Sequence, residues 1–109
     1  MKKDKNFGLQ QQSSVKPAFF GYEKPTPGDV RLVRGLLKMS HAHLACFLGK
    51  KFSEKGSSAV RKWELPIEHK DHREIDYNSW RRMLEAAGIV SIEQSLISAA
   101  KYLEALDRE

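Results

Sequence analysis

Residues that favour helix N-caps recur along the chain at intervals that leave room only for short helices. Each is followed by apolar residues three or four positions apart, the spacing of one face of an amphipathic helix. No stretch shows the alternation of apolar and polar residues that is typical of a β-strand. The sequence therefore predicts an all-α fold, a compact bundle of about five helices. The expected caps are Thr26, Ser40, one of Ser57 and Ser58, Asp76, and Ser91.

The ends of these helices are also marked. Gly49 and Gly88 stand where the left-handed residue after a helix usually lies, and Pro66 stops the third helix. Ser91 with Gln94 has the pattern of a capping box. The expected helices cover residues 26–39, 41–48, 57–64, 77–87 and a last segment after residue 91.

The chain divides into three parts. Residues 1–24 hold five lysines and no apolar periodicity, so we expect a flexible basic arm. Residues 25–90 contain the first four helices and form the expected domain. Residues 91–109 form a C-terminal helix outside that domain.

Charge is distributed unevenly over the 109 residues, which carry a formal net charge of +5. Residues 1–64 have thirteen Lys and Arg against five Asp and Glu, whereas residues 65–109 have six against nine. A basic half next to an acidic half is the pattern expected when one end contacts a polyanion and the other has a different role.

Neither secretion nor membrane insertion is expected. The longest apolar run, from Leu44 to Leu48, is too short to span a bilayer, and no apolar segment follows the basic N-terminus. Cys46 is the single cysteine, so an intramolecular disulfide is impossible and a reducing compartment fits. We expect a cytoplasmic protein, located at the nucleoid if its partner is DNA.

The third expected helix presents polar side chains on its outer face. Its apolar residues, Val60 and Trp63, lie three positions apart and face inward. Ser58, Arg61 and their neighbours Ser57 and Lys62 are left outward. Short hydroxyls and an arginine near the N-terminal end of an exposed helix are able to reach base edges in a major groove.

Four blocks of the chain resemble sequence motifs of the Cro/C1 (Xre-type) helix-turn-helix family, and they occur in the same order as in that family. They are residues 30–34 (VRLVR), 39–49 (MSHAHLACFLG), 60–64 (VRKWE) and 75–84 (IDYNSWRRML). The resemblance covers residues 26–90 and implies a lambda-repressor-like helix-turn-helix that binds double-stranded DNA. It implies base contacts by Ser57, Ser58 and Arg61, and phosphate contacts by His41, Lys50, Lys51, Lys55 and Lys62.

Three departures from the family pattern affect this expectation. Thirteen residues separate Gly49 from Trp63, a longer connection than the family usually has. His41 replaces the usual Gln at the start of the second helix. His43 replaces the usual acidic residue that braces Arg34, and Glu64 is a substitute partner for that arginine.

Metal binding and catalysis are the rival interpretations of the histidines and the cysteine. The usual Cys-x-x-Cys and His-x-x-x-His pairs of a zinc site are missing, so no metal or cofactor is expected. A Cys46–His43 pair has no third group nearby in sequence to orient it, so we expect no enzyme activity. The set considered was His41, His43, Cys46, His69 and His72.

The C-terminal helix carries a regular apolar stripe with spacings of three and four residues. Such a stripe packs either onto the domain or against a second copy of the chain. We favour a homodimer, because palindromic DNA sites usually need two-fold symmetric proteins. Its expected interface is Ile92, Leu96, Ala99, Leu103 and Leu106.

The sequence thus predicts a sequence-specific DNA-binding transcriptional regulator, a repressor encoded by a mobile genetic element. The alternative is an antitoxin-like interaction module, whose C-terminal helix holds a partner protein while the domain binds DNA.

Overall fold

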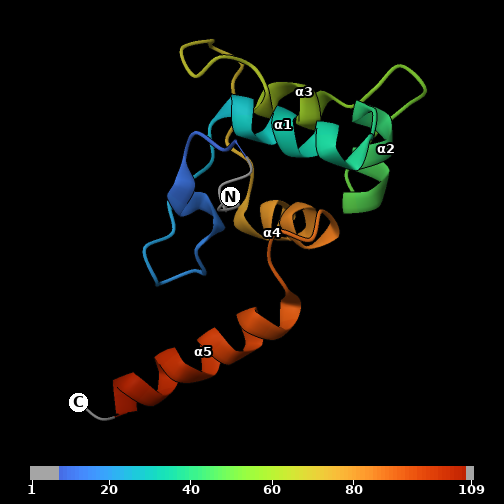
Figure 1. Cartoon of the computed structure of the whole chain (residues 1–109). Coiled ribbons are helices and arrows are strands. Elements are labelled where there is room, and N and C mark those ends of the chain that lie inside the picture. Colours follow the sequence, from blue (N-terminus) through green and yellow to red (C-terminus); the bar gives the residue numbers. More distant parts are fainter. Residues whose placement is uncertain (1–7, 108–109) are drawn as a thin grey trace, which may run out of the picture.

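The structure, a computed structural model, describes residues 8–107, and within that range its regular secondary structure is entirely helical (Figure 1). The all-α prediction is therefore confirmed for the part of the chain that is described. The elements are a short 3-10 helix η1 (Gln12–Val15) and the α-helices α1 (Pro27–Leu37), α2 (His41–Leu48), α3 (Ser58–Trp63), α4 (Tyr77–Ala86) and α5 (Ile92–Asp107).

The predicted caps begin the helices. Thr26 Oγ1 accepts a hydrogen bond from the Asp29 amide at 3.0 Å, and the Asp29 carboxylate accepts one from the Thr26 amide at 3.0 Å. Ser40, Ser57 and Asp76 each accept from the amide three residues later. Satisfying these first amides is what allows helices as short as α2 and α3 to start.

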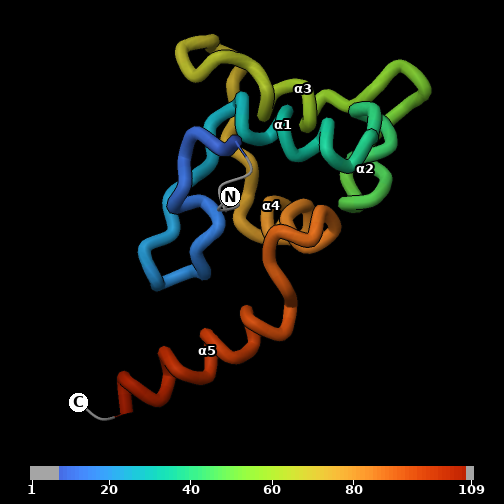
Figure 2. Tube along the Cα trace, in the orientation of Figure 1, coloured from blue at the N-terminus to red at the C-terminus, as the bar shows by residue number. Residues whose placement is uncertain are grey.

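A single apolar core lies between α1, α2, α3 and α4. α1 packs against α4 and α2 against α3, as the Cα trace shows (Figure 2). Trp80, Met83 and Leu84 of α4 are fully buried in this core. The other buried apolar residues are Leu9, Val30, Val33, Leu44, Ala45, Val60, Trp63 and Ile75.

Residues 8–24 pack against the domain, and the prediction of a flexible arm is wrong for them. Leu9 and Ser14 are buried, and Trp80 Nε1 donates to the Ser14 carbonyl at 2.9 Å. The Asp29 carboxylate accepts from the amides of Gln10 and Gln11 at 2.6 and 3.0 Å. Backbone hydrogen bonds to buried polar groups need no apolar periodicity, so this packing left no helical or strand pattern in the sequence. Residues 1–7 of the expected arm lie outside the described residues.

α5 extends away from the other helices (Figure 1). None of its residues is buried, so the alternative in which its stripe completes the core of the domain is also wrong. It is held at one side by Arg81, whose Nη2 donates to Ser95 Oγ at 3.0 Å, and by Tyr102, which stacks on Phe19 at 5.1 Å between ring centroids.

Candidate nucleic-acid interface

One side of α3 is buried against the domain, and its other side is exposed to solvent. Val60 and Trp63 are buried, whereas Ser58 and Arg61 are exposed. Arg61 makes no side-chain hydrogen bond or ion pair with any residue of the 8–107 range. A cationic side chain without an acidic partner is available to an anion.

Ser57 has a structural role that differs from the expected base contact. Its hydroxyl accepts from the Val60 amide at 3.3 Å, and the residue is buried. The sequence allowed either serine to be the cap, and the structure assigns that position to Ser57. Ser58 is therefore the serine that remains accessible on this helix.

Several predicted contact residues line one shallow hollow beside the start of α3. The hollow has a volume of about 310 Å³ and is open to solvent. His41 reaches it from the start of α2, Lys55 from the α2–α3 connection, and Ser58 and Arg61 from α3. These residues are separated by up to twenty positions in sequence, and the fold brings them together. The complete lining is His41, Ser53, Lys55, Gly56, Ser57, Ser58 and Arg61.

The remaining predicted lysines lie around this hollow without lining it. Lys51 is exposed, and Lys62 is half-buried on α3. Lys50 Nζ lies 3.4 Å from Asp76 Oδ1, and the two side chains, 35% and 52% exposed, form an ion pair at the surface. Burial opposes ionisation of Asp76, but hydrogen bonds from Ser79 and the nearby Lys50 outweigh it and hold the pKa of the Asp76 carboxyl below its ordinary value.

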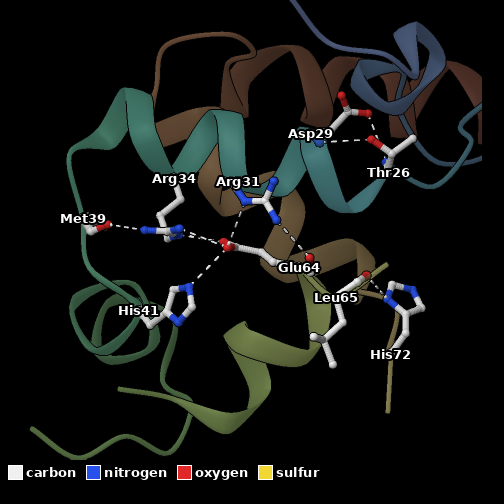
Figure 3. Close-up of polar contacts among 9 residues, drawn as sticks. All are labelled: Thr26, Asp29, Arg31, Arg34, Met39, His41, Glu64, Leu65 and His72. Carbon is white, nitrogen blue, oxygen red and sulfur yellow. Dashed lines mark hydrogen bonds and ion pairs between the residues drawn. The ribbon is translucent and has the colours of Figure 1, made fainter. Parts of the chain in front are cut away.

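Glu64, immediately after α3, is the buried centre of a charge cluster (Figure 3). Arg34 of α1 donates from Nε and Nη2 to the two Glu64 carboxylate oxygens at 2.6 and 3.0 Å. His41 Nε2 lies 3.2 Å from Glu64 Oε1, and Arg31 donates from Nη2 to the Glu64 carbonyl at 3.2 Å. The predicted pairing of Arg34 with Glu64 is confirmed. The contributions of Arg31 and of the Met39 carbonyl, which accepts from Arg34 at 3.0 Å, left no pattern in the sequence.

The cluster has two consequences for the neighbouring surface. It joins the end of α3 to α1 and to the start of α2, so the orientation of α3 is set by buried, bidentate contacts. It also surrounds the one buried carboxylate near α3 with two arginines, which leaves the local charge positive.

The other histidines have local roles in the loop before α4. His72 Nδ1 lies 2.9 Å from the Leu65 carbonyl, and His69 Nδ1 accepts from the Asp71 amide at 3.0 Å. His43 and Cys46 are exposed on α2. Within residues 8–107, no three His, Cys, Asp or Glu side chains gather closely enough to hold a metal ion. In the same range, no helix combines the length and apolarity needed to cross a membrane.

The predicted stripe of α5 is open to solvent along its length. Ile92, Leu96, Leu103 and Leu106 are between 48% and 66% exposed, and Ala99 is also exposed. The side of α5 that faces the domain carries Ser95, Ser98 and Tyr102, and two stripe residues, Ala99 and Leu103, line the same hollow of about 350 Å³ beside residues 17–19. The stripe is therefore an accessible apolar surface whose edge borders the contact with the domain.

No protein-family model matches the chain, and neither a curated protein nor a solved structure is similar to it.

Proposed function

We propose that this chain is a sequence-specific DNA-binding regulator of the Cro/C1 helix-turn-helix type, with α2 and α3 as its helix-turn-helix and α3 as the helix that enters the major groove. The observation that carries the proposal is the convergence of His41, Lys55, Ser58 and Arg61 on one hollow at the exposed side of α3. In this arrangement Arg61 and Ser58 contact base edges, while His41 and the lysines contact phosphates.

The charge cluster behind α3 supports the same proposal. A helix that reads DNA must be held at a fixed angle, and Glu64 holds the end of α3 through Arg34 and His41. Because Glu64 is enclosed by arginines, its negative charge does not oppose the approach of phosphate.

Salt dependence of binding tests the proposal. Affinity for a fluorescent DNA duplex is measured by anisotropy from low to moderate salt. Six or so phosphate contacts predict that log K falls with log salt at a slope near −5, from about −0.9 per contact. An absence of binding at low salt, or binding that salt does not weaken, contradicts the proposal.

We further propose that two copies of the chain pair through the stripe of α5. The stripe follows the three-four spacing of a coiled-coil seam, and its large apolar side chains have no other cover in the described structure. In a parallel pair with this seam, Asp107 flanks the stripe opposite Tyr102 of the second copy, and Glu93 lies at the start of α5 with no helical residue opposite it, so no like charges meet. A second copy is therefore compatible with both the shape and the charge of this surface.

A further inference from the structure

The connection between α2 and α3 contains a tight, hydrogen-bonded turn. The Ser53 amide donates to the Gly56 carbonyl at 2.9 Å, and the Gly56 amide donates back to the Ser53 carbonyl at 3.0 Å. Ser53 Oγ also accepts from the Lys55 amide at 3.1 Å. A connection longer than the family pattern is thus folded on itself, and its tip is stiffened by three hydrogen bonds.

Both ends of this connection are fixed to the domain. At its start, the Lys50 amide donates to the Ala45 carbonyl at 2.8 Å, and the Lys50 side chain pairs with Asp76. At its end, Gly56 lies against His41 at the edge of the hollow. The turn, residues 51–56, therefore projects from the molecule beside α3 in a set position (Figure 1).

The side chains presented by the turn suit the surface of duplex DNA. Within the turn, Phe52 is 54% exposed. It follows the exposed Lys51 and precedes the exposed Lys55 by three residues. An exposed aromatic ring contributes nothing to the core, and water hydrates it poorly. Exposed lysines near an exposed ring suit duplex DNA, because ammonium groups bind phosphates and an apolar ring packs against sugars and base edges.

We propose that the turn is a second DNA-contacting element, in which Phe52 packs against the deoxyribose and base edges of the base step flanking the site of α3, next to the phosphates that the proposed function assigns to Lys51 and Lys55. This inference rests on the proposed DNA binding by α3 and extends the contacted duplex beyond that helix.

Alanine variants of the turn test the inference in the full chain. The probe is a duplex recovered from a random pool with the wild-type protein. We expect Phe52→Ala to raise Kd by about five- to tenfold, with protection lost only at the edge of the footprint. The double variant Lys51→Ala/Lys55→Ala is expected to flatten the slope of log K against log salt by about 1.8, or 0.9 for each phosphate contact.

Two matched controls lie on α5, far from α3. Ile97 is 49% exposed and outside the stripe, and Lys101 is exposed, so Ile97→Ala and Lys101→Ala are expected to leave Kd and the salt slope unchanged. Circular dichroism checks that the turn variants stay folded. We expect them to, because the replaced side chains are exposed. If Phe52→Ala binds like the wild type while Arg61→Ala binds weakly, the Phe52 ring is not in the interface and this inference alone is overturned. If the wild type retains no duplex, both the inference and the proposed function fail.

Discussion

At the scale of single residues, Glu64 is the group on which the arrangement around α3 depends most. Its side chain is 6% exposed and meets Arg34, whose side chain is 20% exposed. A buried carboxylate is stable in its ionised form only while its cationic partners remain. The partly buried Arg34 guanidinium likewise depends on the negative charge of Glu64. Glu64 therefore couples the stability of the domain to the orientation of α3.

Removing this carboxylate should be costly. We expect Glu64→Ala to lower the free energy of unfolding by about 3 kcal/mol, because Arg34 would keep its burial and lose its counter-charge. Urea unfolding followed by circular dichroism measures the change. The exposed Glu68 provides the control, since Glu68→Ala should stay within about 0.5 kcal/mol of the wild type. An equally small effect of Glu64→Ala would mean that the cluster does not hold the helices together.

At this scale the pairing of Arg34 with Glu64 was predictable although the two residues are thirty positions apart, because both stand in the blocks on which the resemblance to the Cro/C1 family rests. The assignment of Ser57 as the buried cap was not, because two adjacent serines offer the same hydroxyl and only the packing of Val60 decides which one begins the helix. The ion pair of Lys50 with Asp76 joins residues from separate elements and had no sequence pattern.

At the scale of elements, the N-cap of α4 controls a helix that supplies much of the core. Asp76 accepts from the Ser79 amide at 3.1 Å, and the pKa of its carboxyl is held below its ordinary value. A lowered pKa means that the ionised carboxylate stabilises the fold at neutral pH. That contribution is lost as the pH falls through the lowered pKa.

Replacing this cap should give a pH-dependent loss of stability. We expect Asp76→Ala to cost about 1 kcal/mol at pH 7, with the difference from the wild type shrinking as the pH falls below the ordinary pKa of the carboxyl. Thermal unfolding across a pH series measures it. Asp76→Asn retains a capping oxygen, so it should lose less at pH 7. A difference that grows on acidification would contradict the assigned role.

The α5 stripe gives a second prediction at this scale. Leu103→Glu keeps a residue with good helix propensity but places a carboxylate in the proposed seam. We expect the wild type to sediment as a dimer at tens of micromolar and the variant as a folded monomer with a nearly unchanged melting temperature, since Leu103 is exposed in the single chain. Lys101→Glu, which places the same side chain at an exposed position of α5 outside the stripe, is the matched control. A monomeric wild type would contradict self-pairing and favour the antitoxin-like alternative, in which this stripe holds a different protein.

The positions at which helices begin were the most predictable feature at this scale, because a cap and its helix are neighbours in sequence. The packing of residues 8–24 against the domain was not predictable. Hydrogen bonds to Asp29, Trp80 and Arg81 fix this segment, and such bonds leave no apolar periodicity in the sequence. The direction of α5 was also beyond the sequence. Its stripe was clear, but whether the stripe faces inward depends on which side Ser95 and Tyr102 attach to the domain.

At the scale of the whole molecule, α3 and the α2–α3 turn lie at one end and α5 at the other (Figure 1). This separation matches the charge pattern, in which residues 1–64 are basic and residues 65–109 acidic. The proposed duplex at α3 and the proposed second copy at α5 would therefore occupy different ends of the molecule. An acidic α5 at the far end would also keep its negative charge away from the proposed DNA backbone.

The most direct test of the central claim is the affinity of the wild type, Arg61→Ala and Lys62→Ala for a duplex recovered from a random pool and for a scrambled duplex. If α3 reads DNA, Arg61→Ala should lose about 1–3 kcal/mol on the recovered duplex and relax the preference at one base position, whereas Lys62→Ala should weaken binding to both duplexes alike. If the wild type binds both duplexes equally, or if both variants lose affinity equally on the two, α3 does not read DNA sequence and is not a recognition helix.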